Sequence, residues 1–107
     1  MTTTREYVPG VRRYASRVNV NAIGRIIRHL GIALTSRDGS RVSVSDKTEL
    51  DRVRDRWLRK KLGLSANNLE LDQHIDEVCN KMRAERSKCR VVFYYLLAEK
   101  FDKLDAI

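Results

Sequence analysis

Apolar residues recur about once per helical turn along most of this 107-residue chain. Such spacing predicts amphipathic helices, each of which turns one apolar side towards a shared core. We predict four helices of this kind, after a frayed start over residues 1–8. Their apolar positions are, in chain order, Val11, Tyr14, Ala15 and Val18; Ile23, Ile26, Ile27 and Leu30; Leu50, Val53, Trp57, Leu58, Leu62 and Leu64; and Leu71, Ile75, Val78, Cys79 and Met82.

Capping residues mark the expected ends of these helices. Asn19 or Asn21 is expected to cap the second helix, and Gly31 to end it in the left-handed conformation that glycine adopts easily. Asp46, followed three residues later by Glu49, resembles a capping box and predicts the start of the third helix.

The C-terminal part of the chain predicts the most buried helix. The fourth helix, capped by Asn67 or Asn68, is expected to break near residues 85–88 with Ser87 as the next cap, and one long bent helix is the alternative. A fifth helix follows over about residues 88–104. Its run VVFYYLLA is apolar on every side, which predicts a place in the middle of a bundle. VVFYY alone also suits a strand, but the continuation LLAEKFDKL keeps the helical spacing.

The segment TSRDGSRVSVSD, residues 35–46, is the one predicted loop, because its small polar residues and Gly39 favour turns. Val42 and Val44 are expected to dock on the core. The alternation in RVSVS suits a short extended stretch, although no partner strand is predicted for it. The preceding IAL, residues 32–34, is expected to be packed rather than exposed.

Together these elements predict an all-α fold, a single compact bundle of about five helices over residues 1–107 with a buried C-terminal helix. A chain of this length suits one domain and can bury a core without metals or disulfides. VVFYYLLA is too short to span a bilayer, and the start MTTTREYVPG has no apolar signal segment. We therefore expect a cytoplasmic protein that does not bind membranes.

The positive charge of the chain is concentrated in its first part. The formal net charge is +8, and residues 1–64 hold 15 Lys and Arg against 6 Asp and Glu. Residues 65–107 hold 7 against 8. A basic half of this kind attracts polyanions without choosing among nucleic acid, acidic protein and anionic membrane.

The densest basic cluster is DRVRDRWLRKKLGL, residues 51–64. On a helical wheel Arg52, Arg56, Arg59 and Lys60 share one side, roughly 100° wide, opposite the apolar stripe. This side is the candidate nucleic-acid or anion-binding surface. The alternative is a solvated face, because a helix dipole favours basic residues near its C-terminal end by about 0.3–1 kcal/mol each.

Two further basic residues, Arg54 and Lys61, fall inside the apolar arc. Their stems are expected to cover the edge of the core while their charges stay in water. Pairs of Asp51 with Arg54 and of Asp55 with Arg59 are expected from their spacing of three and four residues.

No catalytic or metal-binding pattern is recognised. His29, His74, Cys79 and Cys89 lack metal-ligand spacing, and no cysteine is placed beside a histidine as an activated nucleophile. Trp57 belongs to the apolar stripe, so it is expected in the core rather than on a base-stacking surface. We predict neither an enzyme nor a cofactor.

The 35–46 loop is a second candidate anion site. It offers hydroxyls and arginines, among them Ser36 and Arg37, directly before a helix start. Gly39 stands alone, so no phosphate-loop glycine pattern is present. The alternative is a loop whose serines only satisfy backbone groups.

The segments LGIALTSRDGSRVSVSD, ELDRVRDRWLRKKLGL and RSKCRVVFYYLLAEKFDKL resemble a small family of uncharacterised bacterial proteins, a domain of unknown function. SRD, WLRKKLGL and FYYLLAE carry the resemblance, which covers about residues 20–104. It implies an all-helical, stand-alone cytoplasmic domain, and it brings no activity or site residue with it.

Three functions therefore compete. The first is a small non-enzymatic binding module for an unknown protein or polyanionic partner. The second is nucleic-acid binding through the basic residues at 52–61, supported by Arg12, Arg13, Arg25 and Arg28. The third is an enzyme or sensor that holds a phosphate ligand at the 35–46 loop. The sequence predicts no oligomeric state.

Overall fold

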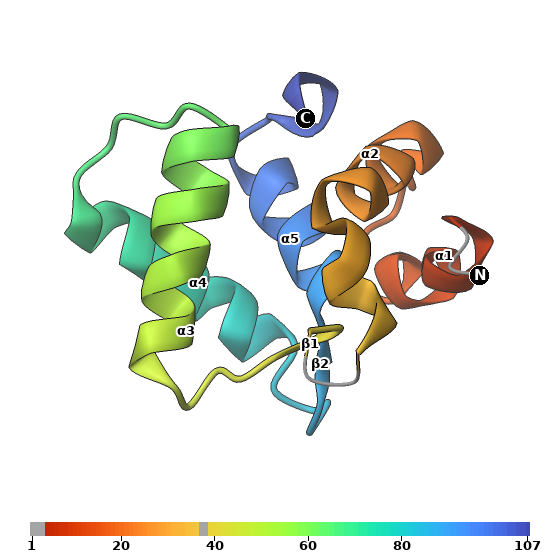
Figure 1. Ribbon diagram of the computed structural model, residues 1–107, viewed down its shortest axis with the longest axis horizontal. Helices are drawn as coiled ribbons and strands as arrows, with labels where there is room; N and C mark the ends of the chain where they lie inside the picture. Colours follow the sequence, from red (N-terminus) through yellow and green to blue (C-terminus); the bar gives the residue numbers. More distant parts are fainter. Residues whose placement is uncertain (1–3, 37–38) are drawn as a thin grey trace.

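The computed structural model describes residues 4–36 and 39–107, and nearly all of its regular structure is helical (Figure 1). The α-helices of this described part are α1 (Thr4–Arg12), α2 (Val20–Leu30), α3 (Lys47–Arg52), α4 (Asn68–Lys81) and α5 (Arg90–Lys100). Two 3-10 turns, η1 (Gly31–Thr35) and η3 (Leu104–Ala106), come after α2 and α5. The predicted all-α bundle of about five helices is confirmed.

Helix α5 is the centre of this bundle. All of its side chains from Val91 to Ala98 are at most 6% exposed. Helices α1 and α2 lie on one side of it, and α3 and α4 on the other (Figure 1). The indole Nε1 of the fully buried Trp57 donates a hydrogen bond to the Tyr94 carbonyl at 3.2 Å. The predictions of a buried C-terminal helix and of a core tryptophan are therefore confirmed.

Helix α1 begins earlier than the hydrophobic pattern predicted. Residues 4–8, which were expected to be frayed, are helical. The helix is held by the fully buried Val11, and it packs against α2 and α5. Its approach to α5 is close, because a Cβ on Gly10 would lie 3.0 Å from Cγ2 of Val92.

Polar caps start α2, α3 and α4. The side chains of Asn19, Asp46 and Asn67 each accept a hydrogen bond, of 2.9–3.0 Å, from a backbone N–H two or three residues later. Gly31 ends α2 with a φ of +50°, in agreement with the prediction. The predicted capping box is wrong, because the Glu49 carboxylate pairs with an arginine of α5 and not with the backbone of Asp46.

Helices α4 and α5 are separate, and one strand of a very small sheet lies between them in the chain. Strand β2 (Lys88–Cys89) pairs antiparallel with β1 (Arg41–Val42). The predicted cap at Ser87 is wrong, because β2 follows it and Cys89 takes the position before α5. The extended stretch at β1 has thus found a partner strand that we did not predict.

The loop before α3 docks on the core through its valines. Val42 is 5% exposed, and Val44 packs against the core as a partly buried side chain. The expectation for residues 32–34 is wrong in part, because Leu34 is buried while Ile32 is 85% exposed. The tight 3-10 turn directs these two side chains to different sides.

Helix α3 continues without a break into a π-helix, η2 (Val53–Lys61). At its end the N–H of Leu62 donates to the Trp57 carbonyl, five residues earlier, at 2.9 Å. Helices of this type are rare and have a wider turn than an α-helix. Trp57 and Leu58 are nevertheless fully buried, so the predicted apolar stripe is confirmed. We refer to α3 and η2 together as the α3–η2 helix.

Candidate functional site

Three of the four residues of the predicted basic face are exposed. The side chains of Arg52, Arg56 and Lys60 have no hydrogen bond or ion pair with any residue that the structure describes. The fourth, Arg59, has a half-buried side chain, which is 34% exposed. The predicted face is therefore divided into free and engaged cations.

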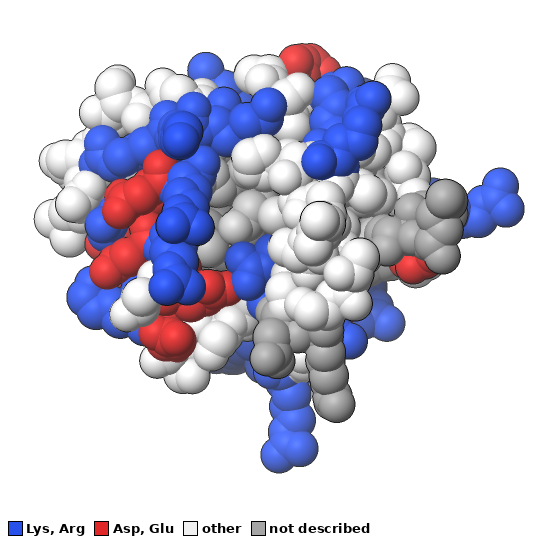
Figure 2. Space-filling model, in the orientation of Figure 1, with Lys and Arg blue, Asp and Glu red and all other residues white. Residues whose placement is uncertain are grey.

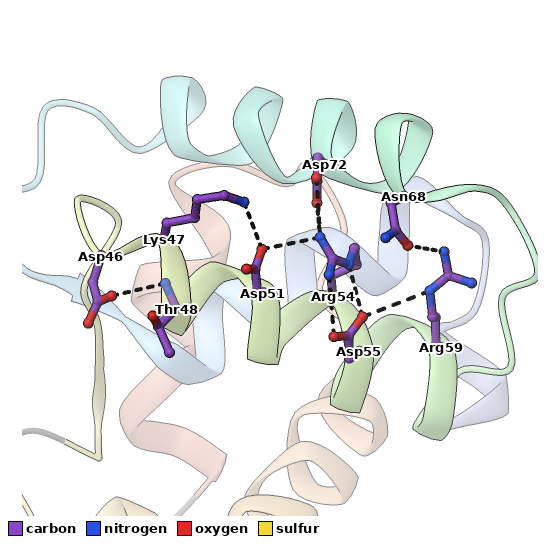
Figure 3. Close-up of polar contacts among 9 residues, drawn as sticks. All are labelled: Asp46, Lys47, Thr48, Asp51, Arg54, Asp55, Arg59, Asn68 and Asp72. Atoms are coloured by element: carbon purple, nitrogen blue, oxygen red, sulfur yellow. Dashed lines mark hydrogen bonds and ion pairs between the residues drawn. The ribbon is translucent and has the colours of Figure 1, made fainter.

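A cluster of charges around Arg54 explains this division (Figure 3). Its guanidinium lies 3.1 Å from Asp51, 2.9 Å from Asp55 and 3.2 Å from Asp72 of α4. The hydrogen bond to Asp55 is the largest of the influences that raise the pKa of Arg54, and it also lowers the pKa of Asp55. Only 11% of the Arg54 side chain is exposed. The expectation that its charge stays in water is wrong, because α4 brings a third carboxylate to it.

Arg59 is also engaged on the side of the helix that faces α4. Its Nε lies 3.9 Å from Asp55, and its Nη2 donates a hydrogen bond to the side chain of Asn68 (Figure 3). Both ion pairs expected from the spacing, Asp51 with Arg54 and Asp55 with Arg59, are confirmed. The side of the α3–η2 helix that faces α4 is thus largely neutralised.

Another side of the α3–η2 helix lies beside α2, and two adjoining hollows form there. Their volumes are about 340 and 430 Å³. None of the described residues that line them has an acidic side chain. Ile107 lines the first hollow as well. We call the site the basic cleft and define it by its basic lining residues, which are Arg25, Arg28 and His29 of α2 and Arg56, Lys60 and Lys61 of η2.

The basic cleft is also visible in the surface charge. In Figure 2, Lys and Arg side chains gather at the upper left, over the end of η2, and again at the upper right, and an acidic side chain stands on the upper edge between these two areas. Lower on the left, over the rest of the α3–η2 helix, basic and acidic side chains alternate. Of the free cations of the α3–η2 helix, Arg56 and Lys60 lie in the basic cleft, whereas Arg52 lies outside it.

His29 lies in the middle of the basic cleft. Its ring packs against Trp57 with a centroid distance of 5.1 Å, and it lines both hollows together with Lys61. Burial, and secondly the positive charge of Lys61, lower the pKa of His29. The imidazole is therefore neutral at neutral pH, and the positive charge of the site comes from the arginines and lysines.

The wider set of basic residues proposed from the sequence is only partly brought together. Arg25 and Arg28 line the basic cleft, whereas Arg12 and Arg13 of the α1 region do not. Arg13 instead pairs with Glu85 at 3.1 Å. Tyr14 also donates to Glu85, and its burial together with this carboxylate raises its pKa to about 12.

Sequence reasoning missed His29, and it placed Lys61 at the edge of the core although it included this residue in the basic segment 52–61. Lys61 was assigned to the edge of the core from a wheel of 100° per residue, which does not describe a π-helix. The only signal for His29 in the sequence was its position next to Arg28 in the last turn of α2, which is weak evidence for a place in a binding site.

Of the two loop residues proposed as an anion site, Ser36 and Arg37, the structure describes only Ser36. The Ser36 hydroxyl accepts a hydrogen bond from the Gly39 N–H at 2.9 Å and lies 3.4 Å from the Ala33 carbonyl. It therefore shapes a turn, as the alternative interpretation expected. Arg37 lies outside the described residues.

Among the described residues, His74, Cys79 and Cys89 do not line the basic cleft. His74 packs edge-on against Phe101 at 4.7 Å, and burial raises the pKa of Cys79. Cys79 and Cys89 are free thiols. Within residues 4–36 and 39–107, no three His, Cys, Asp or Glu side chains come together in a way that would suit a metal ion.

Comparison with known families identifies the family of this chain. It belongs to the family described as Protein of unknown function (DUF2853), whose model matches residues 6–105. The resemblance of three segments to a domain of unknown function is confirmed, and the match reaches further towards the N-terminus than residue 20; a bacterial source stays a prediction. No curated protein matches the chain. None of the helices in the described residues has the length and apolar character needed to cross a bilayer.

Proposed function

We propose that this member of the DUF2853 family is a small, non-enzymatic, cytoplasmic binding module that holds the phosphate backbone of nucleic acid in the basic cleft. One observation carries the proposal: two helices far apart in sequence bring five lysine and arginine side chains to adjoining hollows without an acidic side chain among the described lining residues. A row of cations of this kind suits a ligand with repeated negative charges.

The proposed recognition is of the backbone rather than of the bases. Base stacking needs exposed aromatic rings. Trp57, which packs against His29 of the basic cleft, is 0% exposed and is not available for stacking on a base. We therefore expect little preference for sequence.

A protein partner has less support. The large apolar side chains that are exposed in the described structure are Val20, Ile32 and Leu69. They belong to three different elements, α2, η1 and α4. No single helix therefore presents an exposed apolar face on which a protein partner could dock.

The proposal is tested by fluorescence anisotropy with a labelled single-stranded oligonucleotide of about 16 nucleotides. Binding should weaken steeply between about 50 and 200 mM salt. The logarithmic slope should be about −3.5 if all five cations displace counterions. A slope near zero, or no binding at about 50 mM salt, contradicts the proposal.

A matched pair of lysine variants locates the binding surface. Lys60→Ala should weaken binding severalfold and reduce the magnitude of the salt slope by about 0.7. Lys81→Ala removes an exposed lysine from the last turn of α4, outside the basic cleft, and should change neither quantity. Equal effects of both substitutions would mean that the net charge acts without a defined site.

A further inference from the structure

A second hollow, separate from the basic cleft, is rich in arginine. Its volume is about 560 Å³. It lies where the 39–43 loop, the start of the α3–η2 helix and the turn before β2 meet α5. Its charged lining residues are Arg41, Arg52, Arg86 and Arg90, together with Asp46 and Glu49. We call it the arginine pocket.

Arg90 builds the floor of the arginine pocket. Its guanidinium donates hydrogen bonds to the carbonyls of Gly39 at 2.7 Å and Arg41 at 2.8 Å, and it pairs with Glu49. Arg90 and Glu49 are largely buried, with side chains 13% and 14% exposed. Their charges offset each other, so this pair holds the loop against α3 and α5 rather than attracting a ligand.

The second carboxylate of the pocket is also engaged. Asp46 accepts the N–H of Thr48 at 3.0 Å as the cap of α3. Three arginines remain without an ion pair to any described residue. Arg41 has a hydrogen bond of 3.5 Å to the Ser87 carbonyl.

The charge balance of the pocket indicates the ligand. Four arginines and two carboxylates give the described lining a net charge of +2. A phosphate monoester carries about −1.5 to −2 at neutral pH. Arginine is well suited to this group, because its planar guanidinium can donate two parallel hydrogen bonds to phosphate oxygens. Ser43 and Ser87 line the same hollow and can add hydroxyl donors.

We propose that the arginine pocket binds the phosphate group of a small phosphorylated molecule, with Arg41, Arg52 and Arg86 as the phosphate ligands. The hollow is larger than a phosphate alone and has room for a small organic group beside it. This site goes beyond the proposed nucleic-acid function, because the pocket and the basic cleft share no lining residue.

The test is isothermal titration of the full chain with ribose 5-phosphate at about 100 mM chloride, with ribose as the uncharged match. Saturable binding of ribose 5-phosphate, and none of ribose, is expected. Absence of saturable binding of ribose 5-phosphate, and of inorganic phosphate in a parallel titration, would overturn the proposal.

Two arginines in the same turn of the chain provide matched variants. Arg86 lines the pocket and Arg83 does not, and both are exposed. Arg86→Ala should weaken the binding of ribose 5-phosphate about tenfold, because it removes a hydrogen bond between charged groups. Arg83→Ala should weaken it less than twofold. Equal losses in both variants would show diffuse attraction and would also overturn the proposal.

The two proposals fail independently. Arg86→Ala should leave oligonucleotide binding unchanged, and Lys60→Ala should leave the binding of ribose 5-phosphate unchanged. If Lys60→Ala weakens both ligands equally, the phosphate compound binds in the basic cleft and the arginine pocket is not its site.

Discussion

The two sides of the α3–η2 helix contain similar basic residues but differ in the helix that lies next to them. On the side towards α4, Arg54 and Arg59 meet carboxylates, one of which, Asp72, belongs to α4 itself. On the side towards α2, Arg56 and Lys60 line a hollow with Lys61 and with His29 of α2, and no acidic residue lies among these described lining residues. Helix α2, VNAIGRIIRHL, contains no acidic residue. The availability of an arginine for a ligand is therefore decided by the neighbouring helix.

The largest expected effect of this difference is on stability. Arg54→Met keeps the apolar stem but leaves Asp51, Asp55 and Asp72 close together without their counter-ion. Removal of one partner from a buried ion pair costs about 3–5 kcal/mol. These carboxylates are 37–54% exposed, so water reduces the loss. We expect the free energy of unfolding in urea to fall by about 2 kcal/mol.

The control for this prediction is Arg52→Met on the same helix. Arg52 has no ion pair with a described residue, and its substitution should change stability by no more than about 0.5 kcal/mol. If Arg52→Met and Arg54→Met are equally stable, the cluster around Arg54 has no structural role.

An effect of about 1 kcal/mol is expected on nucleic-acid affinity. Arg56→Ala removes a free cation from the basic cleft and should weaken oligonucleotide binding about fivefold at low salt. Arg59→Ala, three residues later, removes a cation already engaged by Asp55 and Asn68 and should weaken it less than twofold. Anisotropy titrations of both variants measure the contrast, and the reverse order of effects would contradict it.

A smaller effect is expected from pH. The pKa of His29 is lowered in the free protein, so at and below its ordinary value of 6.5 the unfolded chain takes up this proton more readily. The free protein should therefore lose stability as the pH falls through this range. A bound polyanion favours the charged imidazole, so oligonucleotide affinity should rise about threefold between pH 8 and pH 5.5.

His29→Gln is the variant that isolates this pH effect. It should bind with similar affinity at both pH values, because glutamine does not titrate. A rise of the same size in His29→Gln would assign the pH dependence to another group.

The helical core followed from local patterns, and the functional surfaces did not. Asn19, Asp46 and Asn67 cap helices because the side chain and the N–H that it binds are close in sequence. The all-apolar run of α5 likewise indicated its own burial. Such features need no knowledge of how the helices are arranged in space.

The free and the neutralised arginines could not be distinguished by the same means. The contact of Arg54 with Asp72 joins residues 18 positions apart, and the guanidinium of Arg90 reaches Glu49 across 41 positions. The π-helical turn also changes which residues share a side after Val53, so a wheel of constant angle misplaces Lys61. Tertiary packing decides these contacts, and a periodic pattern does not describe it.

The most direct test of the account is a titration of the isotope-labelled protein with a single-stranded oligonucleotide, followed by amide ¹H–¹⁵N spectra. We predict that the largest shifts fall at residues 25–29 and 56–61, while the amides of Asp51, Asp55 and Asp72 stay nearly unchanged. Shifts centred on the Arg54 cluster, or spread evenly over all basic residues, would contradict the claim that the basic cleft, and not the neutralised side towards α4, is free to bind nucleic acid.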